Sequence, residues 1–156
     1  VNVSKAYNNG WVDLRFDFKR NRVVYLIKDG NRVVDAVGRS LTDEKPKWWR
    51  YGRSGFPFIC GVGHVGIVVE DCASACSVSS NYTGIALLGT SLLDSYIPIL
   101  SRYKKLYVAL DKDATKKALD IVIKLQDVTT TKMMILNQDL KDMRDDTRER
   151  VLASYD

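Results

Sequence analysis

The sequence predicts an α/β protein in which a mostly parallel sheet, flanked by helices, follows a small antiparallel sheet rich in basic residues. After Gly61, apolar runs of strand length alternate with helix-like stretches, an order typical of a parallel sheet with helices on its faces. Before Gly61, polar and apolar residues alternate, and Asp29-Gly30 separates two such runs as in a β-hairpin. We therefore expect residues 1–60 to form the basic antiparallel subdomain, with a basic and aromatic loop, and residues 61–156 to form the larger α/β domain.

In the first part, three strands are expected. Val12–Phe18 alternates between apolar and charged side chains, which indicates a half-buried strand. Arg22–Lys28 and Arg32–Gly38 flank the turn and form the hairpin. Residues 39–58 are expected to form a loop because they contain Pro46, Gly52, Gly55 and Pro57.

In the second part, strands and helices are expected to alternate. The strands are expected at Gly66–Glu70, Gly84–Leu88, Lys105–Leu110 and Thr131–Leu136. The helices are expected at Cys72–Ser80, Leu93–Arg102, Ala114–Leu125 and Thr147–Ser154. In the third helix, an apolar stripe of Leu119, Val122 and Ile123 is expected to face the sheet.

Two short acidic clusters each follow an apolar strand-like run. Glu70 ends the first run, and Asp111 and Asp113 follow the second. Ligands of open α/β sheets bind at the carboxyl ends of strands, so we expect these three carboxylates to converge. Asp111 and Asp113 point the same way if the strand geometry extends that far; alternatively, Asp113 is a helix cap or a first-turn acid. Converging carboxylates favour Mg2+ or Mn2+.

The charge is uneven along the chain. The net charge is +5 at pH 7, and the basic residues concentrate between Lys19 and Arg53, where Trp48, Trp49 and Tyr51 also occur. Basic residues interleaved with aromatic ones suit phosphate contacts and base stacking. The alternative is a solvated basic face with ordinary core aromatics.

The cysteines and apolar runs limit the other function classes. Cys60, Cys72 and Cys76 are an odd number without a secretion signal, which favours reduced thiols in a cytosol-like compartment. His64 is the single histidine, so a zinc site or a histidine-based triad is disfavoured. No apolar run approaches the roughly 20 residues that span a bilayer, so we expect no membrane association.

These elements resemble the Toprim domain and, more narrowly, the RNA-polymerase core of bacterial and phage DNA primases. The family pattern is a strand ending in Glu-Gly and a second strand ending in Asp-x-Asp, which stand here as Glu70-Asp71 and Asp111–Asp113. A Leu-Gly-Thr turn between them is present as Leu88–Thr90. Asp71 stands where the family has glycine, and it either adds a fourth carboxylate or caps the following helix.

Flanking elements narrow the resemblance to primases. Gly38–Leu41 and Pro46–Trp48 match the Gly-Arg-x-Leu and Pro-Lys-aromatic elements of bacterial primases, and Lys141–Asp145 is similar to an element of phage primase-helicases. Topoisomerases and overcoming-lysogenization nucleases share only the Toprim core. The resemblance covers about Val23 to Asp146, and its last element favours a bacteriophage protein that works in the cytoplasm of a bacterial host.

The resemblance implies template-directed synthesis of short RNA primers on single-stranded DNA, from ribonucleoside triphosphates, by metal-dependent nucleotidyl transfer. It implies that Glu70, Asp111 and Asp113 are catalytic and hold Mg2+ or Mn2+, with Asp142 as a further ligand or a water-mediated contact. The residues that it implies for nucleotide or DNA binding are Arg39, Lys47, Trp48, Arg50, Gly89 and Thr90. A replicative helicase is a further implied partner.

Three other functions stay open from the sequence. The first is another Toprim enzyme, such as a nuclease that cleaves phosphodiesters with the same acids. The second is a non-catalytic module that binds single-stranded DNA or a replication partner. The third is a receiver domain with acids at its strand ends, in which the basic N-terminal sheet has no role.

Overall fold

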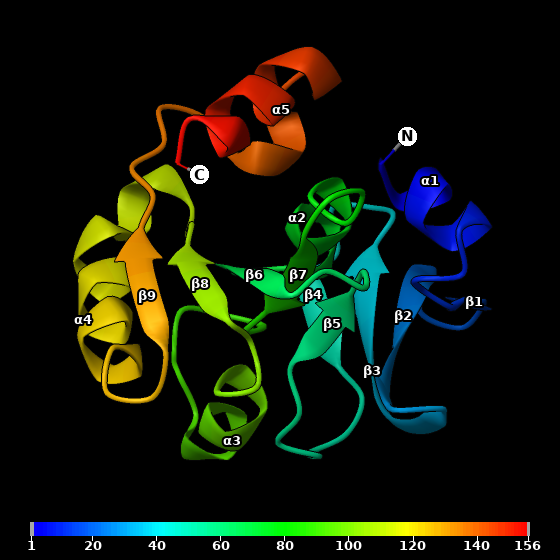
Figure 1. Cartoon of the computed structure of the whole chain (residues 1–156). Coiled ribbons are helices and arrows are strands. Elements are labelled where there is room, and N and C mark those ends of the chain that lie inside the picture. Colours follow the sequence, from blue (N-terminus) through cyan, green and yellow to red (C-terminus); the bar gives the residue numbers. More distant parts are fainter. Residues whose placement is uncertain (1, 156) are drawn as a thin grey trace.

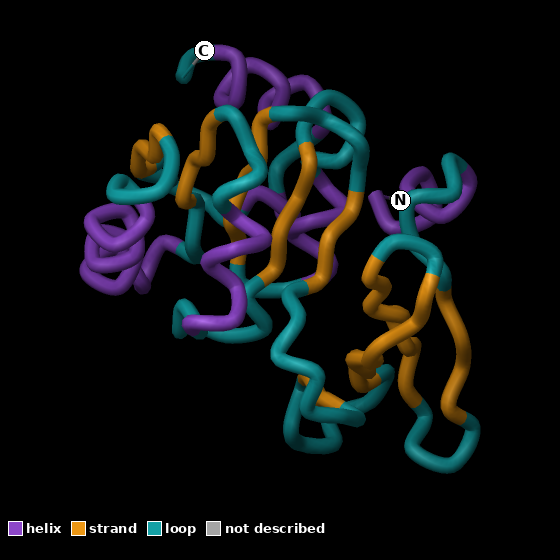
Figure 2. Tube along the Cα trace, turned by 60° about the horizontal axis from the view of Figure 1, so that its bottom comes forward, coloured by secondary structure: helices purple, strands orange, loops and turns teal. Residues whose placement is uncertain are grey.

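The computed structural model describes residues 2–155. It confirms the predicted class, an antiparallel sheet followed by a mostly parallel sheet that is flanked by helices (Figure 1). Figure 2 shows the strands in two separate groups that stand beside each other. None of the helices within these residues is long and apolar enough to cross a membrane.

The first sheet is antiparallel and has four strands in the order of the chain. They are β1 (Leu14–Asp17), β2 (Arg22–Asp29), β3 (Arg32–Ser40) and β4 (Trp48–Arg50). The β2–β3 turn contains Gly30 at φ 63°, a left-handed conformation that glycine adopts without a steric cost. The predicted hairpin therefore forms where the sequence places it.

The second sheet has the order β5-β7-β6-β8-β9. Its strands are β5 (Phe58–Cys60), β6 (Val65–Val69), β7 (Thr83–Ala86), β8 (Lys105–Val108) and β9 (Thr130–Met133). Only β5 is antiparallel to its neighbour; β6 pairs in parallel with β7 and β8, and β8 with β9. The central strands are largely buried on both faces, which explains why most of their residues are apolar.

Helices cover both faces of this sheet. The α-helices are α1 (Asn2–Asn8), α2 (Cys72–Ser77), α3 (Ile97–Leu100), α4 (Thr115–Leu125) and α5 (Asp145–Ala153). Short 3-10 turns are η1 (Asp94–Tyr96), η2 (Lys112–Ala114) and η3 (Leu140–Asp142). One hydrophobic core joins the sheet to α1, α2 and α5, and the other joins its opposite face to α3 and α4.

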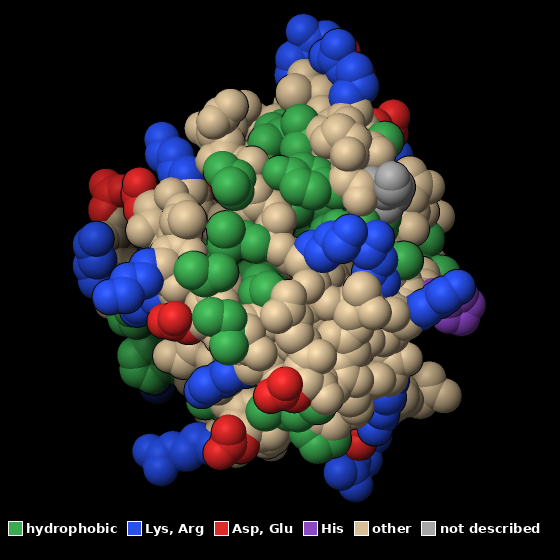
Figure 3. Space-filling model, turned by 60° about the vertical axis from the view of Figure 1, so that its left-hand side comes forward, with side chains coloured by type: hydrophobic (Ala, Val, Ile, Leu, Met, Phe, Trp, Pro, Cys, Tyr) green, Lys and Arg blue, Asp and Glu red, His purple; other side chains and the backbone are tan. Residues whose placement is uncertain are grey.

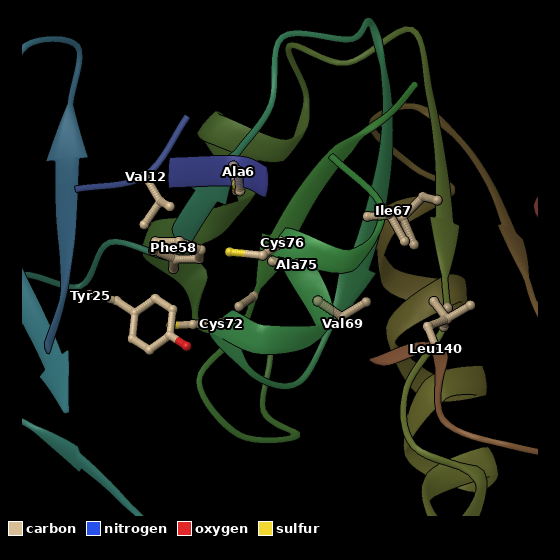
Figure 4. Packing of buried hydrophobic residues seen from close by; sticks show 14 of the residues in the cluster. Ala6, Val12, Tyr25, Phe58, Ile67, Val69, Cys72, Ala75, Cys76 and Leu140 are labelled. Carbon is tan, nitrogen blue, oxygen red and sulfur yellow. The ribbon is translucent and has the colours of Figure 1, made fainter. Parts of the chain in front are cut away.

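The first of these cores also fastens the two sheets together. Tyr25 from β2 packs edge-on against Phe58 from β5, with ring centroids 5.8 Å apart. Figure 4 shows both rings beside Cys72 of α2 and near Ala6 of α1. All three cysteines are free and buried, and they fill space in or beside this packing as predicted.

Three local predictions were wrong. The strand expected at Val12–Phe18 is shorter, since β1 covers Leu14–Asp17, and Phe16 and Phe18 of its apolar face are exposed. The expected loop at residues 39–58 contains β4. This strand has only three residues between loop-forming neighbours, which is too short for an alternating pattern to be recognised in the sequence.

In α4, Leu119 and Ile123 are exposed instead of facing the sheet. The buried stripe is Ala118, Ile121, Val122 and Leu125, with the spacing i, i+3, i+4, i+7. Figure 3 shows hydrophobic side chains gathered on the face of the molecule that carries α4 and β9.

Candidate functional site

Two carboxylates meet at the carboxyl edge of the parallel sheet. Strands β6 and β8 are neighbours, with Val68 paired to Val108, so the segments that follow them leave the sheet side by side. Glu70 stands directly after β6 and Asp111 shortly after β8. Burial first, then a hydrogen bond with Asp111 and the charges of Asp111 and Asp71, together raise the pKa of Glu70 to about 7. The site therefore concentrates negative charge that lacks a full counter-charge.

Asp71, which stands where the Toprim pattern has glycine, has two structural contacts. Its Oδ1 accepts a hydrogen bond of 2.9 Å from the backbone N–H of Ser74 and caps α2. Its Oδ2 forms a 2.7 Å ion pair with Nζ of Lys141, which comes from η3. Of the two possibilities for Asp71, the structure therefore favours the helix cap, and it adds an ion pair that the sequence pattern did not indicate.

The turn after β7 fixes the backbone of Glu70. The carbonyl oxygen of Glu70 accepts hydrogen bonds from the N–H groups of Leu88, at 2.8 Å, and Gly89, at 3.2 Å. Gly89 has φ 141°, which glycine adopts easily, and it lines the cleft next to Glu70. Thr90 lies elsewhere: its Oγ1 accepts a 2.9 Å hydrogen bond from Lys117, in a separate hollow beside α4.

The opposite wall of the cleft comes from the antiparallel sheet. Lys47 and Trp48 line both an inner cavity of about 290 Å3 and an outer hollow of about 500 Å3, and Asp111 and Lys141 line them as well. The ring of Trp48 lies 5.6 Å from that of Tyr25 and packs on the core. The guanidinium of Arg39 lies 5.7 Å from the centroid of Trp48, on the side of the outer hollow. A basic and aromatic wall thus faces the acidic edge.

Arg50 also borders the inner cavity, but its donors are used within the protein. Its Nε forms a 2.9 Å ion pair with Asp35, whose side chain is 1% exposed. Its two Nη atoms bond the hydroxyls of Tyr96 and Ser54 and the carbonyl oxygen of Phe56. These contacts fasten β4 to η1 and to the loop before β5, so Arg50 holds the wall of the cleft in place.

The other two predicted ligands lie outside the carboxylate pair. Asp113 is exposed on η2 and lines neither part of the cleft, because β8 ends at Val108 and the strand alternation does not extend to it. Asp142 is exposed at the end of η3 and lines the outer hollow with Asp111. Within residues 2–155, no three Asp, Glu, His or Cys side chains come close enough to form a metal site by themselves.

Known structures share this architecture, although neither a protein-family model nor a curated protein matches the sequence. The chain aligns with the DnaG primase catalytic domain bound to ssDNA at a TM-score of 0.68 and 21% identity, over 97% of this chain and 58% of that one. It aligns with the E. coli primase catalytic core at a TM-score of 0.68 and 21% identity, over 97% and 58%. A DNA primase domain from Pseudomonas aeruginosa gives a TM-score of 0.64 and 20% identity, over 98% and 61%.

The fold is that of a DnaG primase catalytic core. The chain spans about three fifths of the length of the solved primase domains that it matches. At about one-fifth identity the match establishes the primase fold, while the roles of individual residues rest on the geometry of the cleft.

Lys141 is the residue in this cleft that the sequence reasoning did not assign. Lys141 follows an irregular segment and lies 70 residues from Asp71 in the sequence, so no periodic pattern predicts that the two residues meet. The available signal was electrostatic, since adjacent acids at a buried sheet edge need a cation nearby.

Proposed function

We propose that this chain is the catalytic core of a DNA primase, which makes short RNA primers on a single-stranded DNA template from ribonucleoside triphosphates. One observation carries the proposal. In a primase fold, the close carboxylates Glu70 and Asp111 face Lys47 and Trp48 across one cleft. Contact with a replicative helicase and a place in the cytoplasm of a bacterial host, with the gene carried by a phage, are further parts of this proposal.

The donor set fits a divalent cation of the Mg2+ or Mn2+ type. Mg2+ is usually bound by one or two carboxylates, with waters and substrate phosphates completing its shell. Glu70 and Asp111 supply two such carboxylates, and the pKa of Glu70 is raised by burial and by the neighbouring acid, as expected where two acids share a site. We propose that these two residues hold the ion directly and that Asp113 and Asp142 assist, through water or after the adjoining loops adjust.

The cation, when bound, would neutralise phosphate charge and lower the pKa of the attacking hydroxyl. The chain's own residues would position the reactants. Lys47 and Arg39 would contact phosphates of the nucleotide or template, as a point charge and as a bidentate donor respectively. Trp48 would form the wall of the cleft next to the base of the nucleotide. Gly89 would allow close approach of a phosphate beside Glu70.

Arg50 and Thr90 would act indirectly. The contacts of Arg50 keep β4, and therefore Trp48, at a fixed distance from the acids. Thr90 fixes the turn after β7 through its bond with Lys117. A nucleotide contact through the bonded guanidinium of Arg50 requires these internal bonds to open, whereas the hydroxyl of Thr90 accepts from Lys117 and can still donate its own hydrogen.

The test is primer synthesis on single-stranded DNA with labelled ribonucleotides and Mg2+ or Mn2+. Asp111→Ala should abolish synthesis in a folded protein, whereas Asp127→Ala, an exposed acid after α4, should leave it unchanged. Primers from purified Asp111→Ala at the normal rate would refute the assignment of the site. Metal-dependent nicking of DNA without primers would instead support the nuclease alternative, and DNA binding without either activity would support a non-catalytic module.

A further inference from the structure

Two phenylalanines on the basic subdomain are exposed together. Phe18 is 88% exposed and Phe16 is 41% exposed, and their rings meet edge-on with centroids 4.8 Å apart. Large aromatic side chains left in water are costly, and a cluster of them on a folded domain marks a binding surface. The turn that follows β1 and carries Phe18 is held by hydrogen bonds. Oδ1 of Asp17 accepts them from the backbone N–H groups of Lys19 and Arg20.

The strand register connects this pair to the cleft. Phe16 of β1 is paired with Val23, Val23 with Arg39, and Arg39 with Trp48 of β4. Directly opposed residues of antiparallel strands have their side chains on the same face. The four side chains therefore form one row across the sheet, which begins at the cleft wall and ends at the exposed rings.

The length of this row suits a few nucleotides. Neighbouring strands lie about 4.8 Å apart, so three steps from Trp48 to Phe16 cover about 14 Å. A stacked strand advances about 3.4 Å per nucleotide, so roughly four nucleotides cover that distance and the next base reaches Phe18.

The charges around the row favour a polyanion as the ligand. Arg39 lies within the row, Lys47 precedes Trp48, and Lys19 follows Phe18. A groove that combines basic side chains with exposed aromatic rings is the usual design of a site for single-stranded nucleic acid.

The other aromatic residues of this sheet are already occupied. Trp49 points to the opposite face, because residues adjacent in a strand alternate, and the guanidinium of Arg20 covers it at 4.5 Å. The hydroxyl of Tyr51 donates a 2.5 Å hydrogen bond to Asp17. Phe16 and Phe18, which the sequence alternation placed on the apolar face of a half-buried strand, are exposed and are therefore a better stacking surface than Trp49 and Tyr51.

We propose that Phe16 and Phe18 form a stacking platform for unpaired bases, and that single-stranded DNA runs from the cleft along Trp48 and Arg39 to this platform. The choice of DNA as ligand rests on the proposed function, whereas the platform itself rests on exposure, register and charge. The platform would hold the template about four nucleotides from the acids and would do so without regard to base identity, since every base has a face that stacks.

The test compares binding of the full chain to a fluorescent oligo-dT of about 16 nucleotides, a length at the upper end of single-fold binding sites, by anisotropy. Phe18→Ala should bind about fivefold to 100-fold more weakly, the range expected from loss of one stacked base. Phe18→Trp should bind like the wild type. Ile135→Ala, an exposed apolar residue after β9, is the matched control and should have no effect.

A second oligonucleotide separates stacking from charge. On a strand of the same length with abasic sites, wild type and Phe18→Ala should bind equally, because only the sugar-phosphate chain remains. The salt dependence of binding should be unchanged in Phe18→Ala and weaker in Arg39→Gln, since only the arginine contacts phosphate in this proposal. Equal binding of oligo-dT by wild type and Phe18→Ala would overturn the platform, and it would point to a protein partner for the two rings.

Primer synthesis by the same preparations distinguishes the two proposals. Active wild type with an unaffected Phe18→Ala refutes the platform alone. A Phe18→Ala defect in binding, with no synthesis by the wild type, refutes the proposed enzymatic function and leaves the platform standing. A wild type that does not bind oligo-dT at all refutes the platform together with the DNA partner.

Discussion

Replacing Glu70 by Gln should stabilise the metal-free protein at alkaline pH. The pKa of Glu70 is raised from 4.5 to about 7, chiefly by burial and then by Asp111. At 1.36 kcal/mol per pKa unit this corresponds to about 3 kcal/mol of unfavourable free energy when the carboxyl is charged. Because the group is partly exposed, screening by solvent reduces the expected gain of Glu70→Gln to about 1–2 kcal/mol.

The pH window follows from the sign of that pKa change. Between pH 4.5 and 7 the folded state holds a proton that the unfolded state has lost, so the stability of the wild type falls as pH rises through this range. The two proteins should therefore be similar near pH 4 and differ most above pH 7. Urea unfolding in EDTA at pH 4.5, 6 and 8 measures this difference.

Magnesium provides the second half of the experiment. A ligand at 100 times its Kd stabilises a fold by about 2.7 kcal/mol, so Mg2+ should raise the Tm of the wild type at pH 8 and have little effect on Glu70→Gln. A variant that is less stable than the wild type at pH 8 in EDTA, or one that Mg2+ stabilises equally, would refute the reasoning that Glu70 and Asp111 form a charged pair awaiting a cation.

Three further substitutions test the contacts that hold the elements around the cleft in place. Arg50→Met should lower the free energy of unfolding by about 3 kcal/mol, because it leaves the buried carboxylate of Asp35 unpaired, and adding Asp35→Asn should recover part of this loss in urea titrations. Lys141→Met should lower the free energy of unfolding by about 1–3 kcal/mol, because it removes the partner of Asp71. Calorimetry should nevertheless show tighter Mg2+ binding, because the cleft becomes more negative. Weaker Mg2+ binding would contradict this account. Gly84→Ala should cost about 3 kcal/mol or prevent folding, since the added Cβ would lie 2.1 Å from a carbonyl oxygen of α2, and a stable variant would show that α2 can move away from β7.

The fold could largely be predicted because its strands and helices carry strong local patterns. Strand β6 is a continuous apolar run, β8 is apolar after Lys105, and the β2–β3 hairpin is marked by Asp29-Gly30. The failures occurred where local pattern is weak. Strand β4 is three residues long and owes its pairing to β3, and in α4 several apolar residues compete for the buried face, a choice that packing against the sheet decides.

The site was predictable only in part, for a geometric reason. Residues that directly follow neighbouring parallel strands must lie close, which is why Glu70 and Asp111 meet. Each residue beyond a strand end adds freedom, and by Asp113 the chain has entered a 3-10 turn that takes the side chain away from the pair. The contact between Lys141 and Asp71 comes from an irregular segment, for which neither period 2 nor period 3.6 applies.

The charges of the cleft suggest why the protein tolerates Asp71 where the family has glycine. A third carboxylate beside Glu70 and Asp111 would raise the repulsion at the sheet edge, but the ion pair with Lys141 neutralises it and leaves the pair for a cation. Across the cleft, Lys47 forms no ion pair with a carboxylate among residues 2–155, and the neighbouring Trp48 packs on the core. Lys47 lines the same cavity as Glu70 and Asp111, and the ion pairs of residues 2–155 do not join it to either acid. The nucleoside triphosphate and cation that we propose would match both walls at once, because the phosphates would suit the basic wall and the cation would suit the acids. Asp71 and Lys141 should therefore tolerate replacement together better than singly. The double variant Asp71→Gly, Lys141→Met should retain more Mg2+-dependent activity than Asp71→Gly alone. In the single variant, the unpaired lysine would compete with the cation for Glu70 and Asp111. Equal or lower activity of the double variant would show that Lys141 serves the reaction directly.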